Sequence, residues 1–173
     1  SAKLDESNRF TFKMKSVEDG LYNFNHTPEY QYVYLEKGDS LLVRLNTLYF
    51  DESLVFSGNN EEINNFLLEL FLANEEEQEM MHKEYYNLES EEFITKINEL
   101  REEKLKTIAT IKEESQLSDM AVRIANASVD YTYYGYMELY PFKHKRSLKE
   151  HGIQELSDTF YDYRKNIDYN DKE

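Results

Sequence analysis

The chain has 173 residues and a formal net charge of −15 at pH 7, with 35 acidic side chains against 20 lysines and arginines. This balance disfavours nucleic acids and anionic membrane surfaces as partners, because binding phosphates requires clustered Lys and Arg. The absence of cysteine excludes a disulfide, a thiolate metal site and thiol catalysis within this sequence.

The first sixty residues carry the pattern of short strands. Residues 9–17 alternate between apolar and polar side chains, which predicts a half-buried strand with Phe10, Phe12 and Met14 on its inner side. Turn residues then separate four further short runs, at 21–24, 30–35, 41–45 and 53–56. Strands at this spacing predict a small antiparallel sheet or sandwich, and we assign residues 1–60 to a β-rich domain.

After Asn60 the apolar period lengthens to three or four residues, which predicts a helical domain over residues 61–173. A first helix is expected from about residue 61 to 85, and a second opens at Ser90 with one charged face. Residues 147–150 have the form of a capping box before a short helical turn, and 160–167 form a last apolar patch. The fold class predicted is α+β, with the N-terminal sheet followed by a bundle of three to five helices.

The helical domain is expected to pack around one apolar helix at residues 118–140. Ser118 is a favourable N-cap, and Pro141 is expected to end the helix because a proline disfavours helical backbone angles in the residue before it. Gly135 costs about 1 kcal/mol relative to alanine inside a helix. We therefore expect something to pack closely against it.

Three groups of residues around this helix are candidates for contact with a partner: its tyrosines, the cations that follow Pro141, and the C-terminal patch around Phe160 and Tyr163. Its tyrosines have the character of an aromatic platform, although core packing also explains them. The cations that follow Pro141 are either a docking patch for an acidic partner or a neutralised helix C-terminus. The possible interaction surface comprises Tyr131, Tyr134, Tyr136, Lys143, Lys145, Arg146, Phe160 and Tyr163.

No arrangement of residues in the sequence predicts a catalytic, cofactor or metal site. The four histidines lack metal-ligand spacing, and the acidic runs such as 75–79 fit solvated helix faces. A carboxylate-dependent hydrolase is an alternative, because such an enzyme requires two acids facing each other in a cleft. One of the two would then have a strongly raised pKa, which distinguishes this alternative from an interaction module.

Five stretches together resemble one family: residues 34–41 (YLEKGDSL), 50–58 (FDESLVFSG), 64–67 (NNFL), 138–142 (ELYPF) and 160–165 (FYDYRK). The sequence resembles the N-terminal region of Bacteroidetes envelope lipoproteins whose C-terminal part is a thioredoxin-like thiol–disulfide oxidoreductase domain. The resemblance implies a β-sandwich-like module and a helical spacer ahead of that redox domain. It also implies attachment to the membrane only through a lipid anchor upstream of Ser1, at the cell envelope or in the periplasm.

The sequence departs from this family in one respect that decides activity. A redox domain of that type uses a Cys-x-x-Cys pair, and this sequence has no cysteine to carry that role. We therefore expect a non-catalytic accessory module, the front part of a longer protein, which positions or contacts a protein or neighbouring domain. The alternatives are a stand-alone acidic ligand-binding protein, a carboxylate-dependent hydrolase, or an acidic inhibitor of a basic enzyme.

Overall fold

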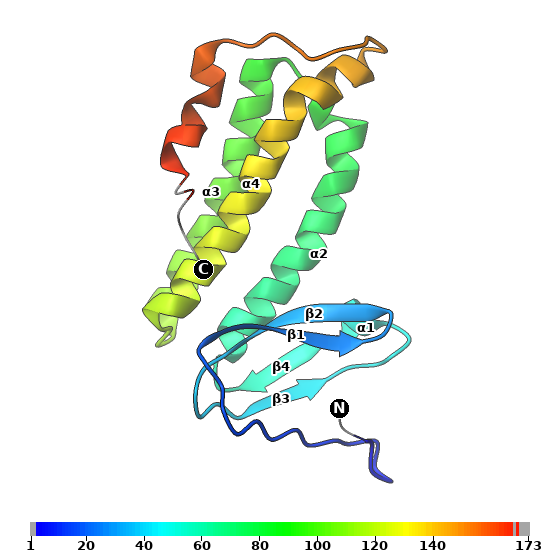
Figure 1. The fold of residues 1–173 in the computed structure, drawn as a ribbon, viewed down its shortest axis with the longest axis vertical. Coiled ribbons are helices and arrows are strands. Elements are labelled where there is room, and N and C mark those ends of the chain that lie inside the picture. The colour runs from blue at the N-terminus through cyan, green and yellow to red at the C-terminus, as the bar shows by residue number, and fades with distance from the viewer. Residues whose placement is uncertain (1–2, 168, 170–173) are drawn as a thin grey trace.

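The computed structural model describes residues 3–167 and 169. The predicted α+β class is confirmed: two small antiparallel sheets lie at one end, and three long helices extend away from them (Figure 1). The predicted single sheet or sandwich is thus resolved into two separate pairs of strands.

Each sheet is a pair of strands adjacent in sequence or nearly so. β1 (Gly20–His26) pairs with β2 (Glu29–Leu35), in a register that places Gly20 opposite Leu35 and His26 opposite Glu29. β3 (Leu41–Arg44) pairs with β4 (Val55–Gly58), with the short helix α1 (Phe50–Ser53) between them. A two-stranded sheet is marginal by itself, so both depend on packing against the helices.

Two consecutive asparagines at the start of α2 (Glu61–Lys83) attach both sheets to the bundle. Asn64 Oδ1 accepts from Tyr34 N at 2.7 Å and its Nδ2 donates to Tyr34 O at 3.0 Å. Asn65 does the same for Phe56, with both distances 3.0 Å. One side chain therefore satisfies the backbone of β2 and the next satisfies that of β4, as a neighbouring strand would.

The remaining helices form an antiparallel bundle capped by a short C-terminal segment. The 3₁₀ turn η1 (Tyr85–Asn87) leads into α3 (Ser90–Glu114), and α4 (Asp119–Ser147) follows after a short loop. Ser118 Oγ accepts from Ala121 N at 3.0 Å, which confirms the predicted N-cap. The 3₁₀ helix η2 (Asp158–Asn166) then lies along the bundle (Figure 1).

The helical core is divided into two apolar clusters by a polar layer. Lys104 Nζ, on α3, donates to Glu77 Oε2 at 2.6 Å and to Asn74 Oδ1 at 3.0 Å, both on α2. Asn74 Nδ2 lies 3.4 Å from Thr132 Oγ1 on α4. One cluster surrounds Tyr34 and the other Phe93; a third cluster lies between the sheets and α2.

The expectation of a strand at residues 9–17 is wrong. No strand forms there, and Phe10, Phe12 and Met14 are exposed by 43%, 57% and 42%. Apolar and polar residues do alternate over 9–17, but within the described chain no sheet edge pairs with this segment. Phe10 contributes a single stacking contact, with its ring centre 6.5 Å from that of Phe24.

Two expectations about the end of the central helix are also wrong. Pro141 does not end α4, which continues through it to Ser147. Its buried ring packs inside the bundle, and tertiary packing outweighs the hydrogen bond that proline cannot make. Ser147 is consequently the last residue of α4 and Leu148 its C-cap, so residues 147–150 do not form a capping box for a new helix.

Candidate functional site

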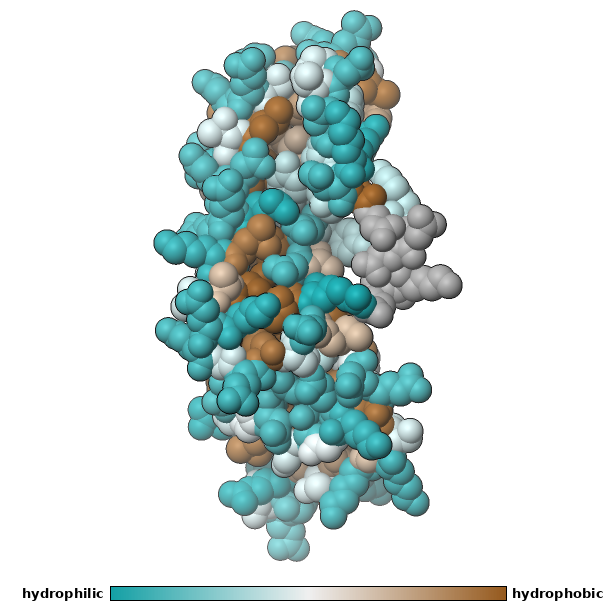
Figure 2. Space-filling model, turned by 90° about the vertical axis from the view of Figure 1, so that its left-hand side faces the viewer, coloured by the Kyte–Doolittle hydropathy of each residue, from teal (hydrophilic) through white to brown (hydrophobic). Residues whose placement is uncertain are grey.

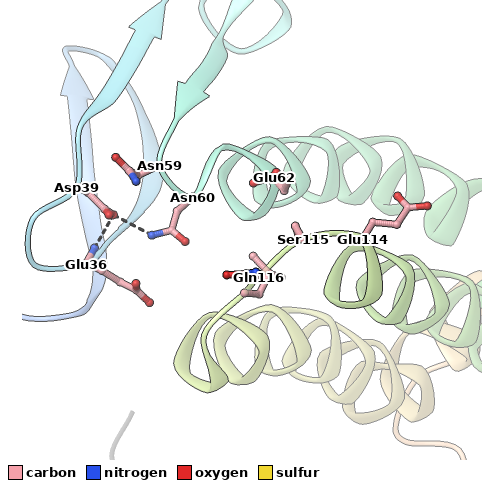
Figure 3. Close-up of a pocket in the computed structure, with 9 residues that line it drawn as sticks. Glu36, Asp39, Asn59, Asn60, Glu62, Glu114, Ser115 and Gln116 are labelled. Carbon is pink, nitrogen blue, oxygen red and sulfur yellow. Dashed lines mark hydrogen bonds between the residues drawn. The ribbon is translucent and has the colours of Figure 1, made fainter.

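A polar cavity of about 320 Å³ lies where the β-sheets meet the α3–α4 loop (Figure 3). The β2–β3 turn and the start of α2 form one wall, and the end of α3 forms the other. Four carboxylates share its lining with amides and a serine: Glu36, Asp39, Asn59, Asn60, Glu62, Glu114, Ser115, Gln116 and Leu117. This cavity is where the hydrolase alternative can be tested against geometry.

Two of these carboxylates are engaged in holding the local structure. Asp39 Oδ2 accepts from Glu36 N at 2.8 Å and from Asn60 Nδ2 at 2.9 Å, as the dashed lines in Figure 3 show. Glu36 Oε1 accepts from Tyr34 OH at 2.6 Å. Hydrogen bonds from Ser118 and Tyr34 lower the pKa of Glu36, so this carboxyl is ionised near neutrality and acts as an acceptor, not a proton donor.

A raised carboxyl pKa occurs elsewhere in the fold. Burial, followed by the charges of Glu29, Glu75 and Glu52, raises the pKa of Asp51 on α1. Asp51 does not line the cavity. Within residues 3–167 and 169, no cluster of three or more His, Asp or Glu side chains is suited to hold a metal ion.

Three residues of the predicted interaction surface are buried in the bundle. Tyr136, Phe160 and Tyr163 are exposed by only 8%, 3% and 7%. The Phe160 ring stacks on Tyr140, with ring centres 5.5 Å apart. The predicted last apolar patch, residues 160–167, thus covers α4, and its Phe160 and Tyr163 side chains are internal.

The packing of η2 is reinforced by a polar contact with α4. Tyr163 OH donates to Glu138 Oε1 at 2.6 Å, and Arg164 binds both oxygens of the same carboxylate at 2.6 and 2.5 Å. These hydrogen bonds, led by that from Arg164, lower the pKa of Glu138. Tyr134 is half-buried and stacks on Tyr163, with ring centres 6.0 Å apart, so it belongs to the same contact.

The other candidates lie on or beside the exposed side of α4. Tyr131 is 53% exposed, and the cations Lys143, Lys145 and Arg146 occupy the last turns of the helix rather than a loop after it. Cations there interact favourably with the partial negative charge of a helix C-terminus. Lys145 Nζ pairs with Glu150 Oε2 at 2.5 Å, whereas Lys143 and Arg146 form no ion pair with any residue that the structure describes.

Two apolar residues on this side of α4 were not among the predicted surface residues. Leu139 and Phe142 are 46% and 51% exposed. Together with Tyr131, Gly135 and Arg146 they form the outer stripe of α4, whose steps of four, four, three and four residues place all five on one helix face. That spacing was visible in the sequence, but the assumption that Pro141 ended the helix hid it.

Exposed apolar surface is limited elsewhere on the helical part. On the face shown in Figure 2, apolar groups form a narrow band through the middle of the molecule, between hydrophilic residues. Apolar atoms exposed in this way are normal for a folded surface. The outer stripe of α4 differs because its members follow one another along a single helix.

Comparison with known proteins found no matching family model, no matching curated protein and no matching solved structure. None of the helices in the described part of the chain has an apolar stretch long enough to cross a membrane.

Proposed function

We propose that this chain is a non-catalytic accessory module of a cell-envelope protein, which positions or contacts a thioredoxin-like redox domain. The resemblance in its sequence supplies the kind of partner. The arrangement of charges supplies the contact surface, at the C-terminal end of α4. Compartment and anchoring through an upstream lipid remain part of this proposal.

The observation that carries the proposal is the concentration of cations in one place on an acidic chain. Residues 139–149 contain Lys143, Lys145, Arg146 and Lys149 and no acidic residue, in a chain with a net charge of −15. Exposed Phe142 lies among them. An apolar side chain among cations, of which only Lys145 has an ion-pair partner among the described residues, suits a contact with an acidic, partly apolar surface.

The cavity chemistry supports a binding role over hydrolysis. Hydrolysis by paired carboxylates requires one acid that keeps its proton near neutral pH. In the cavity, the pKa of Glu36 is lowered and not raised. Asp39 accepts hydrogen bonds from Glu36 N and Asn60 Nδ2, which hold the β2–β3 turn. The cavity residues thereby join the sheets to the bundle.

The test is a nuclear magnetic resonance titration of the isotopically labelled chain with a thioredoxin-like domain from a Bacteroidetes envelope lipoprotein. We expect shifts confined to the C-terminal half of α4 and to the residues beside it. The double variant K143E/R146E should weaken binding at least fivefold. The matched control K106E changes one exposed cation on α3 and should leave binding unchanged.

Two outcomes would overturn the proposal. The first is the absence of any shift at millimolar concentrations of the redox domain. The second is shifts that cluster around the cavity near Glu36 while K143E/R146E binds as the native chain does. Because exposed charges act mainly on the association rate, a binding rate that falls with added salt provides an independent check.

A further inference from the structure

Gly135, near the centre of the outer stripe of α4, leaves the helix backbone without a covering side chain. Gly135 has ordinary helical angles, is exposed, and an added Cβ would meet no other atom within 4 Å. Within the described residues, no part of this chain therefore packs against Gly135. A glycine in an exposed helix costs about 1 kcal/mol relative to alanine, so its presence without an internal neighbour requires an external reason.

The stripe is complementary to itself when two copies of the helix run antiparallel. Suppose that a two-fold axis passes the midpoint between Glu138 and Leu139. Position 142 of one copy then lies opposite position 135 of the other, and position 146 lies opposite position 131. The Phe142 ring of one copy then lies over the bare backbone at Gly135 of the other. Arg146 faces the ring of Tyr131, which is a favourable cation–aromatic pairing.

We propose that the outer stripe of α4 is the interface of a two-fold symmetric dimer of this chain. A two-fold interface uses the same patch on both copies, so each bulky residue requires its recess on the identical surface. Phe142 and Gly135 satisfy that requirement, as do Arg146 and Tyr131. The inference goes beyond the proposed function and does not depend on it; because both contacts use Phe142 and Arg146, one copy makes only one of them at a time.

The charges around the stripe are compatible with the antiparallel arrangement. The cations gather at the C-terminal end of α4, so reversal separates those of one copy from those of the other. Lys143 and Lys145 flank the stripe at the levels of Tyr134 and Thr132 of the other copy, and neither of these residues is charged. Glu138 is already bound to Arg164, and no two like charges are opposed across the midpoint.

The contact is small and each copy is strongly acidic. Specific stable interfaces bury more than about 1,200 Å² in total, so one helix face from each copy gives a weak dimer. Repulsion between two chains of net charge −15 is screened by salt. Association should therefore strengthen as salt is added, whereas docking of the cations on an acidic partner weakens.

Analytical ultracentrifugation of the chain alone, from 10 µM to 1 mM, tests the proposal. We expect the average mass to rise from 20.8 kDa toward twice that value, at lower protein concentration in 0.5 M than in 0.05 M sodium chloride. Gly135→Leu should raise the dissociation constant at least tenfold, because it fills the recess for Phe142. The same variant should unfold at higher temperature, since leucine is a better helix former than glycine.

Cross-linking then tests which surface is used, because the chain contains no native cysteine. Leu139→Cys lies beside the two-fold axis and leaves the other four positions of the stripe intact. It should form disulfide-linked dimers at least ten times faster than Leu48→Cys, whose position is 83% exposed away from α4. A chain monomeric at 1 mM in high salt, equal cross-linking of the two variants, or unchanged association of Gly135→Leu would each overturn the dimer.

Discussion

Replacement of Asn64 by alanine tests how the sheets are attached to the bundle. Asn64 is fully buried, and besides its two bonds to Tyr34 its Nδ2 donates to Asn60 O at 2.9 Å. Alanine leaves the N–H and C=O of Tyr34 buried without partners, at about 1–3 kcal/mol each. Together the two groups cost about 2–6 kcal/mol. We expect the free energy of unfolding of the variant to fall by about 3 kcal/mol, which lies within that combined range.

Urea unfolding followed by circular dichroism measures this loss. With a denaturant dependence of about 2 kcal/mol per molar, the midpoint should fall by about 1.5 M. The matched control is Asn23→Ala, at an exposed position on β1, which should change stability by less than about 0.5 kcal/mol. If both variants shift the midpoint equally, the side chain of Asn64 does not support β2, and the proposed attachment of this sheet to α2 is wrong.

Three further predictions concern α4 and the tyrosines. Ser118→Ala should cost about 1 kcal/mol, measured by the same urea titration, because it removes the N-cap of α4; Ser118→Asn should largely restore it. The lowered pKa of Glu138 means that its contribution is complete above the unfolded value near 4.3 and is lost as pH falls through the folded value. Amide exchange in η2 should therefore accelerate on acidification, and Glu138→Gln, which lacks this titration, should show no such acid-induced step. Burial raises the pKa of Tyr86 and Tyr140 to about 12, so these two should remain protonated in an ultraviolet titration at pH 11. Their stabilising effect is complete below pH 10 and disappears as pH rises through 12; an early single transition at pH 10 would contradict their burial.

The helices were predictable because their local signals agree with their packing. Ser90 and Ser118 mark helix starts that the structure confirms, and the apolar period identified the buried faces of α2 and α3. These signals lie within one segment and need no information about the rest of the chain.

The failures in the fold concern signals that depend on distant neighbours. Alternation at residues 9–17 shows that a segment can form a strand, but not whether a sheet edge is available to pair with it. Pro141 illustrates the opposite case, in which packing of the surrounding bundle overrides a local helix-breaking signal.

The candidate surface was partly predictable. Sequence alone located the cations and Tyr131, but assigned Phe160 and Tyr163 to the surface because nothing in the sequence shows that η2 folds back onto α4. The role of Asn64 and Asn65 was likewise hidden, because an amide that completes a strand ladder resembles any other polar residue until its partner is known.

The polar layer around Lys104 has a consequence for the alignment of the three long helices. Apolar contacts are non-directional, so by themselves they discriminate weakly against a helix displaced along its axis by one turn. Such a displacement would carry Glu77 about 5.4 Å away from Lys104 and leave two half-enclosed charges without counterions. The ion pair therefore makes one alignment of the bundle distinguishable from its neighbours, and with it fixes where the sheets at the end of α2 are held.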